Sequence, residues 1–457
     1  MIFFSKFKKH AAFQLAVLLT LFSFPLLTRA DSELPQLGEN AALNLQQEIE
    51  LGSGLYHELK QRGYVIDDPL VSRYLQDIGQ SLLSKMDVRF RNYHFFLVKD
   101  ASVNAFAAPG GYIGVNIGLI AIARNVDELA SVLAHEIAHV RLKHSMQMIE
   151  RAQKVNIASM ISLLAAILIS GQDTEVANAI LFTGIAGSTQ SMINYTRENE
   201  YEADRVGIEL LKKSDYNPHA AADFMRTLQS REQGGELADI EYLRTHPVSE
   251  NRIAEINSRL QDVGEKVSSP LHFQQYKDFL FYLYPQTSAR RHSRFALALE
   301  QMRNGKYKLA ESVLRDLLKY DPDSLWLNYA LAQNLEFQQK TDQAMAIYRS
   351  TLLIYPDDLA LNLKLSRLLL QQGKPQQALR SAQGVFRRYR EEAAIYQLQV
   401  EIYAQLGKEL QKQLAEANYH WYNGNRDQAS KQFEALLKND ALDIATAAEI
   451  RQKIESL

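Results

Sequence analysis

The 457-residue sequence contains no cysteine. Disulfide bonds, thiolate metal ligands and a cysteine nucleophile are therefore excluded. An excess of positive charge is also lacking, because 51 Lys and Arg stand against 53 Asp and Glu, so a general nucleic-acid-binding protein is not expected. With 46% hydrophobic and 23% charged residues, the chain has the composition of a soluble globular protein, and its length indicates two or three domains.

Residues 1–30 have the features of a cleavable export signal. Lys6, Lys8 and Lys9 give a positive start, residues 11–27 form an apolar run, and small residues precede a cleavage point after Ala30. An uncleaved membrane anchor is the alternative, but the polar stretch "ADSELPQ" that follows favours cleavage. Export without cysteine predicts a periplasm-like compartment, where disulfides are permitted and this chain forms none.

The following region, residues 31–265, mixes helical patterns with two strand-like stretches at 93–100 and 104–116. The "PGG" at 109–111 is a turn signal between apolar runs, so the second stretch is predicted to be a hairpin. A helix is expected to begin at Asn125, because a glutamate three positions later completes a capping box.

Two uncharged stretches, 155–172 and 176–196, interrupt this region. Each is long enough to span a bilayer, but several glycines and polar residues weaken that interpretation. Residues 155–196 are therefore expected to form a lid-like or buried helical pair, and a membrane-proximal segment with peripheral membrane contact stays as the alternative.

Residues 266–457 carry an internal repeat. Small residues recur, with a period of about 34 residues, where paired helices would touch, which is typical of the tetratricopeptide repeat, an α-solenoid unit that binds proteins. After Gly407 the register shifts by half a period, which predicts one extra helix before the last pair. The residues with this spacing are Ala298, Ala332 and Ser366, Ala310, Ala344 and Ala378, and Pro322 and Pro356.

The stretch "LAHEIAHVRLKH", 133–144, holds three histidines and a glutamate. On a helix, His135 and His139 lie on one face and can bind one ion, while Glu136 is displaced by about 100° and can reach a water on that ion. Zinc in such a site lowers the pKa of its water and polarises a peptide carbonyl, and the glutamate moves the proton to the leaving nitrogen. The motif therefore predicts a zinc hydrolase.

A further ligand is expected downstream in "NEYEAD", 199–204. Glu200 and Asp204 are four positions apart and share a helix face, so one can bind the metal while the other accepts a hydrogen bond from a ligand histidine. The spacing alone does not decide which carboxylate has which role.

Together, "HEIAHVRLKH", "ENEYEADRVG", "NAFAAPGGYIGVNIGLI" and "RTHPVSENRI" resemble the gluzincin family that includes the CAAX prenyl endopeptidases and HtpX-type membrane proteases. The resemblance implies that His135, His139 and Glu200 bind one Zn²⁺ per chain, with Glu136 as the catalytic base and Asp204 as the supporting carboxylate. The expected fold is mostly α, with a zinc metalloprotease domain containing a small β-sheet and then a tetratricopeptide solenoid.

The same resemblance implies quality control and assembly of outer-membrane proteins in the periplasm. Unfolded or misassembled outer-membrane proteins would be the clients, and the repeats would contact the outer-membrane β-barrel assembly machinery. Two alternatives stay open: a non-proteolytic chaperone or scaffold acting through the repeats, and a membrane-embedded protease. The complete set of one glutamate base and three ligands argues against a site that has lost its activity.

Two other histidines need an interpretation. His144 comes five positions after His139 without the glycine of a metzincin, so it is expected to be structural or to support a ligand rather than to bind the metal. Pro247 places His246 on a loop. His246 either packs near the site or acts as a regulatory fourth ligand that displaces the water.

The predicted hairpin also has a functional interpretation. Metalloproteases bind an extended substrate as an added strand against an edge strand beside the metal. The first arm of the hairpin, with Asn104, Ala105, Phe106 and Ala107, is the candidate for this edge strand, and an ordinary core strand is the alternative.

Overall fold

The computed structural model describes residues 45–86, 93–151, short pieces between 157 and 165, 189–234, 240–267, 270–285 and 293–455. The predicted export signal and most of the stretch 155–196 lie outside these described residues. Among the helices within them, none combines the length and the apolar character needed to cross a bilayer.

A four-stranded mixed sheet lies at the centre of the N-terminal half. The strand order is β1-β2-β4-β3; β2 and β4 are parallel, and both outer pairs are antiparallel. The predicted hairpin is confirmed, because β3 and β4 are joined through the "PGG" turn, where Gly110 has a φ of 70°. The strands are β1 (Val65–Ile66), β2 (His94–Val98), β3 (Ala105–Ala107) and β4 (Tyr112–Asn116).

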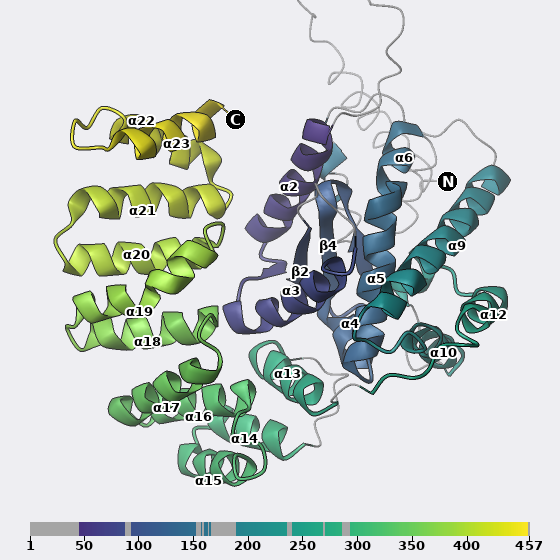
Figure 1. Cartoon of the computed structure of the whole chain (residues 1–457), viewed down its shortest axis with the longest axis horizontal. Coiled ribbons are helices and arrows are strands. Elements are labelled where there is room, and N and C mark those ends of the chain that lie inside the picture. Colours follow the sequence, from purple (N-terminus) through teal and green to yellow (C-terminus); the bar gives the residue numbers. More distant parts are fainter. Residues whose placement is uncertain are drawn as a thin grey trace, which may run out of the picture. The chain divides into compact units, whose positions relative to one another are not determined.

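In the described part of this half, helices lie beside the sheet (Figure 1). Helix α5 begins as predicted, since the side chain of Asn125 accepts a hydrogen bond from the amide of Glu128 at 2.9 Å. Every residue from Asp127 to Val140 of α5 is buried, so its histidines lie inside the molecule and not on a solvated face. The helices are α2 (Leu45–Gln61), α3 (Pro69–Leu83), α4 (Ile117–Ile122), α5 (Val126–Leu142) and α6 (His144–Arg151).

Helix α9 (Thr189–Lys213) packs along α5 (Figure 1). The close approach depends on Gly207, where an added Cβ would lie 3.3 Å from the backbone of Ala134 and His135. This contact brings the acidic motif of α9 beside the histidines of α5. In the described ranges that follow, α10 (Ala220–Gln233) packs on α5, α12 (Glu250–Arg259) packs on α9 and α10, and the short α11 (Glu241–Thr245) lies between them in the sequence.

The C-terminal half consists of helices in the described ranges, as predicted. The turns at Gly305, Gln339, Gly373 and Gly407 all have positive φ and fall at the same place in successive repeats. Gly424, with φ 88°, comes only half a period after Gly407, so α20, α21 and α22 run consecutively as the predicted shift in register requires. The helices are α13 (Pro270–Leu283), α14 (Arg294–Arg303), α15 (Tyr307–Leu317), α16 (Leu325–Phe337), α17 (Thr341–Ile354), α18 (Leu359–Gln371), α19 (Pro375–Arg388), α20 (Ala393–Gln405), α21 (Glu409–Tyr422), α22 (Arg426–Leu436) and α23 (Ile444–Glu455).

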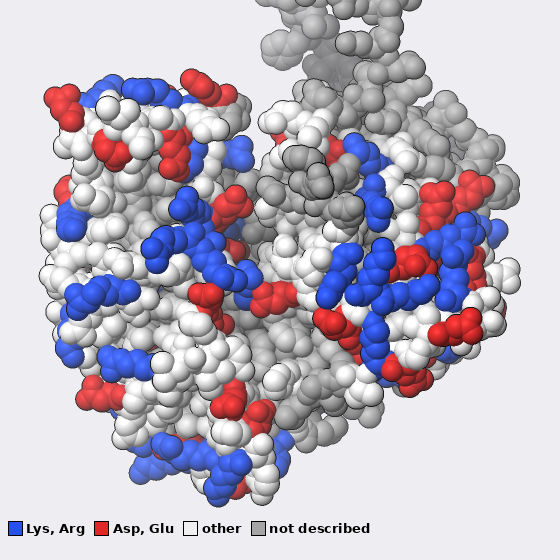
Figure 2. Space-filling view, in the orientation of Figure 1, with Lys and Arg blue, Asp and Glu red and all other residues white. Residues whose placement is uncertain are grey.

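Charged side chains of both signs alternate over the face shown in Figure 2. Near α9 and α12, for example, Glu255 pairs with Arg205 at 2.7 Å and with Arg259 at 3.0 Å. This interspersed pattern agrees with the near-neutral composition of the chain.

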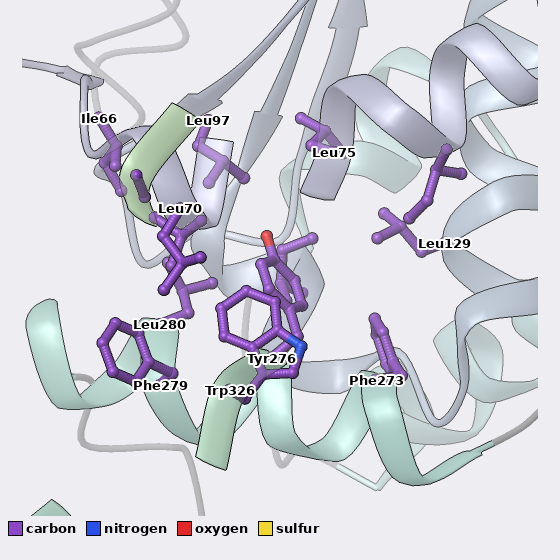
Figure 3. Packing of buried hydrophobic residues seen from close by; sticks show 14 of the residues in the cluster. Ile66, Leu70, Leu75, Leu97, Leu129, Phe273, Tyr276, Phe279, Leu280 and Trp326 are labelled. Carbon is purple, nitrogen blue, oxygen red and sulfur yellow. The ribbon is translucent and has the colours of Figure 1, made fainter. Parts of the chain in front are cut away.

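Helix α13 joins the two halves of the apolar core (Figure 3). Tyr276 is fully buried, stacks on Tyr74 of α3 with ring centroids 4.2 Å apart, and lies 5.5 Å from the ring of Trp326 in α16. The boundary near residue 265 stays a prediction, but α13, which we assigned to the repeats, contacts both α3 and α16.

Candidate metal centre

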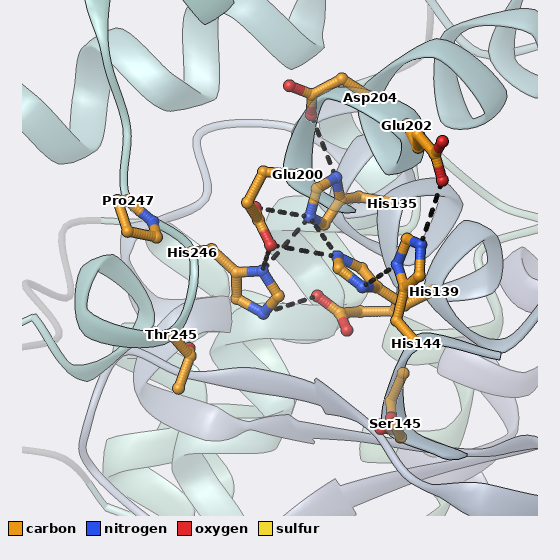
Figure 4. A network of polar contacts seen from close by, with 12 residues as sticks. His135, His139, His144, Ser145, Glu200, Glu202, Asp204, Thr245, His246 and Pro247 are labelled. Carbon is orange, nitrogen blue, oxygen red and sulfur yellow. Dashed lines mark hydrogen bonds and ion pairs between the residues drawn. The ribbon is translucent and has the colours of Figure 1, made fainter. Parts of the chain in front are cut away.

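Four buried side chains from three separate segments meet at one point, as Figure 4 shows. Helix α5 contributes His135 and His139, and α9 contributes Glu200. His246 is the C-cap residue that follows α11. One ligand atom from each lies within 4.8 Å of all the others, and each residue is less than a tenth exposed. The cluster is thus a ready set of nitrogen and oxygen donors.

The separations of these donor atoms fit a tetrahedral ion. Zn–N distances of about 2.0–2.1 Å require donors to be about 3.3 Å apart along each tetrahedral edge. Nε2 of His135 lies 3.0 Å from Nε2 of His139, 3.3 Å from an oxygen of Glu200 and 3.3 Å from Nδ1 of His246. Glu200 lies 3.4 Å from Nε2 of His139 and 2.9 Å from Nδ1 of His246. The contact with His135 involves Oε2 of Glu200, and the contacts with His139 and His246 involve Oε1, so the four side chains lie close enough together to hold one small metal ion.

Glu136 lies beside this cluster without belonging to it. Its side chain is 1% exposed, and among the described residues neither of its carboxylate oxygens has a hydrogen-bond partner. Its Oε1 is 3.5 Å from Nε2 of His246. Burial raises the pKa of the Glu136 carboxyl, and His246, His135 and the nearby amide of Ala107 oppose this rise in part. Glu136 is thus a buried carboxylate that lies at ion-pair distance from His246 and outside the four-residue cluster.

Asp204 supports the ligand histidine of α5. Its Oδ1 lies 3.1 Å from Nδ1 of His135, so the imidazole is held with Nε2 toward the cluster. Burial would raise the pKa of Asp204, but hydrogen bonds from Arg252 and His135 lower it, so this carboxylate stays charged. The predicted division of roles between the two acidic residues of α9 agrees with these contacts.

Arg252 of α12 is the important residue that we did not predict. Its guanidinium binds Asp204 through two hydrogen bonds of 2.7 and 2.8 Å and lies 2.9 Å from Glu200. The same group donates to the carbonyl of Pro247 at 2.7 Å, so it also holds the loop next to His246. The quoted stretch "RTHPVSENRI" contains Arg252, but nothing in the spacing indicated partners on a helix so far away in the sequence.

The pKa shifts within the cluster differ from residue to residue. Burial would lower the pKa of His135, but hydrogen bonds to Asp204 and Glu200 raise it to about 10. Burial alone would raise the pKa of Glu200, yet His246 and hydrogen bonds from His135 and His139 lower it well below its usual range. Burial lowers the pKa of His139 to about 3. A charged carboxylate and a neutral imidazole are the forms in which these side chains bind metals.

The structure also places the two histidines outside the HExxH motif. His144 is buried and contacts His139, but the four-residue cluster does not include it, in agreement with our expectation. Glu198 and Glu202 of α9 are exposed. His246 points to the cluster, which the sequence left open between two interpretations.

The first arm of the hairpin, β3, is an edge strand of the sheet and contacts α5. The amide of Asn116 donates to Asn104 and that of Ala108 to Tyr112, so alternate residues of this arm face β4. The backbone groups of Ala105 and Ala107 therefore face outward. The outward carbonyl of Ala107 accepts a hydrogen bond from the hydroxyl of Ser145 at 2.7 Å, a side-chain contact that an incoming strand can replace.

Comparisons with known proteins agree with this geometry. The model of peptidase family M48 matches residues 69–260, which include every residue of the centre. Tetratricopeptide-repeat models match residues 301–368, 337–402 and 414–451. The chain thus carries an M48 domain followed by tetratricopeptide repeats, and it is a metalloendopeptidase of that family.

Among its relatives are beta-barrel assembly-enhancing proteases. That of Escherichia coli (strain K12) is 29% identical over 338 residues, which cover 68% of each chain. A putative beta-barrel assembly-enhancing protease of Vibrio cholerae is 34% identical over 229 residues, 50% of this chain and 47% of the relative. A mitochondrial metalloendopeptidase of Saccharomyces cerevisiae is 30% identical over 168 residues, 36% of this chain and 46% of the relative.

Proposed function

We propose that the chain is a periplasmic zinc endopeptidase, with one Zn²⁺ per chain, that takes part in the quality control and assembly of outer-membrane proteins. The observation that carries the proposal is the close approach of four buried nitrogen and oxygen donors, with the buried carboxylate of Glu136 beside them. The donor set of two or three imidazoles and one carboxylate suits zinc, which takes N and O ligands at these separations.

His135, His139 and Glu200 hold the ion in this proposal. Bound there, zinc supplies a Lewis acid that lowers the pKa of water and polarises a carbonyl group. Glu136 accepts the proton from the attacking water and delivers it to the leaving amide nitrogen, because its carboxylate is buried, without a hydrogen-bond partner and poised by a raised pKa. Asp204 keeps His135 in the required tautomer, and Arg252 compensates the charge of both α9 carboxylates.

The substrate is an extended polypeptide that pairs with β3. Ala105 and Ala107 offer outward backbone groups there, and Asn104 and Phe106 pair with β4 to hold the strand in place. Such pairing depends on main-chain hydrogen bonds, which only an extended segment can offer. The site therefore favours unfolded or extended clients. A folded β-barrel offers no free edge to such a site.

The proposed clients and compartment rest on the names of the relatives, on the export features of residues 1–30 and on the solenoid. The relatives' names link them to β-barrel assembly, which makes unfolded or misassembled outer-membrane proteins the proposed clients. The export features of residues 1–30 support the periplasm. The solenoid, residues 266–457, is the proposed contact to the outer-membrane β-barrel assembly machinery, since repeats of this kind present extended surfaces to proteins.

His246 closes the centre in the resting enzyme. Its Nδ1 lies 3.3 Å from Nε2 of His135 and 2.9 Å from Glu200, where it would take the place of a water on a bound ion. Its Nε2 lies 3.5 Å from Glu136, so the imidazole separates the proposed ligands from the proposed base. Peptide hydrolysis needs this space for water and for the scissile carbonyl. The loop must therefore withdraw before cleavage, and client binding can drive this change only by favouring the withdrawn state.

His246→Ala is expected to retain zinc and to cleave an unfolded client faster than the wild type. If His246 occupies the centre in about nine tenths of the molecules, only about one tenth can cleave at any moment. Removal of the imidazole then raises the single-turnover rate roughly tenfold. Substitution of the exposed His272 serves as the control and should change nothing. A role for His246 in stabilising the transition state predicts the opposite sign, a fall of about 10²–10³-fold, and that result would exclude the plug.

The proposed function is tested by metal content and by client choice. We expect one zinc per purified chain and none in His135→Ala, which lacks a ligand. The wild type should cleave a urea-denatured outer-membrane β-barrel protein after dilution, and it should spare the same protein folded in detergent micelles. Full zinc occupancy in His135→Ala, or equal cleavage of both client forms, contradicts the proposal.

A further inference from the structure

The second ligand histidine, His139, has an imidazole partner where the first has a carboxylate. Asp204 contacts Nδ1 of His135, whereas Nδ1 of His139 lies 2.9 Å from Nδ1 of His144. The His144 side chain is 5% exposed, and its ring is nearly perpendicular to that of His139 at 74°. We infer that His144 positions His139 for the metal by accepting a hydrogen bond from its Nδ1–H. This inference rests on the proposed metal centre.

The direction of this hydrogen bond follows from the geometry. Nε2 of His139 faces the cluster, at 3.0 Å from His135 and 3.4 Å from Glu200, so it is the atom available to a metal. The other nitrogen, Nδ1, then carries the hydrogen and is a donor. Its neighbour at 2.9 Å must accept, so His144 is neutral, with its own hydrogen on Nε2. That atom faces the exposed Glu202 at 3.5 Å, a carboxylate of the sign that favours this tautomer.

An interruption of the helix between α5 and α6 brings His144 to this position. On an uninterrupted helix a residue five positions after His139 would lie about 140° round the axis and face away from it. Helix α5 ends instead at Leu142. Its C-cap residue, Lys143, has the left-handed conformation with φ 59°, and α6 begins at His144. The next residue, Ser145, donates to the carbonyl of Ala107 in β3. The start of α6 therefore contacts both the metal ligand and the proposed substrate strand.

The pairing has a physical consequence for metal affinity. A hydrogen bond to the remote nitrogen fixes the tautomer and ring orientation and increases the basicity of the ligating nitrogen. Loss of such a partner weakens metal binding about 10–100-fold. A purely space-filling histidine would show no such dependence on an acceptor atom.

Three full-length proteins test the inference: the wild type, His144→Leu and His144→Asn. Leucine fills similar space without an acceptor, while the amide oxygen of asparagine can take the place of Nδ1. With zinc and a competing chromogenic chelator, we expect His144→Leu to bind zinc about 10–100-fold more weakly. His144→Asn should stay within about threefold of the wild type. Unchanged affinity in His144→Leu, or an equal loss in both variants, overturns the inference.

Two further measurements separate this role from general damage. Urea unfolding of the metal-free proteins is expected to give similar midpoints for His144→Leu and the wild type. The two should differ in the additional stability that zinc confers, which reports the affinity directly. Nitrogen-15 spectra of the zinc-loaded wild type should show His144 protonated on Nε2; protonation on Nδ1 contradicts the inference. A wild type that binds no zinc would instead refute the proposed function.

Discussion

Glu136→Gln is expected to lower the rate of peptide cleavage by about 10²–10⁴-fold while zinc stays bound. The carboxylate is not one of the four clustered donors, so a ligand is not lost. Glutamine has the same shape but cannot accept the proton from water. Neither oxygen of Glu136 has a hydrogen-bond partner in the described part of the chain. Replacing the carboxylate with the neutral amide of glutamine therefore breaks no hydrogen bond there, and the fold should tolerate it.

Single-turnover cleavage of an unfolded client and metal analysis of the same sample measure both halves of this prediction. Glu198→Gln is the matched control, since Glu198 is an exposed acidic residue on α9. Activity near the wild-type level in Glu136→Gln would mean that another group is the base. Loss of zinc together with activity would assign Glu136 a role in holding the ion.

Arg252→Met is expected to have the largest effect on stability, a loss of about 3–5 kcal/mol in the metal-free protein. The Arg252 and Asp204 side chains are only 4% and 8% exposed, so removal of the guanidinium leaves a buried carboxylate without its partner. Arg205→Met removes a pair with Glu255 that is half exposed at the arginine, and it should cost about 1 kcal/mol or less.

Denaturant titration of the metal-free proteins compares the two substitutions. A second change, Asp204→Asn, is expected to restore part of the stability of Arg252→Met, because it removes the unpaired charge. Arg252→Lys keeps the charge but cannot reach Asp204, Glu200 and Pro247 together, so an intermediate loss is expected. If Arg252→Met costs no more than Arg205→Met, the buried network does not stabilise the fold.

Local patterns predicted the parts of the centre that depend on helical spacing. His135 and His139 face one point because they are four positions apart on one helix, and Glu200 and Asp204 do so for the same reason. Asn125 begins its helix as the capping pattern indicates. The period of the C-terminal repeat likewise predicted the solenoid, because each repeat packs mainly on its neighbours in sequence.

Contacts between distant segments could not be predicted in this way. Arg252 binds carboxylates of a helix far away in the sequence, and a lone arginine near a proline has no periodic signal. Lys143 has the left-handed αL conformation, which is more typical of glycine, and it directs His144 back toward His139. Because the residue is a lysine, the sequence did not indicate this turn. The parallel pairing of β2 with β4 also depends on the whole sheet. The strand pattern alone did not indicate its direction.

The sequence indicated which residues on each helix share a face, since helix geometry fixes the direction of side chains four positions apart. Their roles in the proposed chemistry came from the family resemblance and stay predictions. The sequence also determined that no sulfur takes part as a thiolate. The close approach of α5 and α9 at Gly207, which joins the two motifs, and the contact of His246 with Glu200 were visible only in the folded structure. Such contacts depend on packing among segments far apart in the chain, and packing leaves no spacing in the sequence from which to infer it.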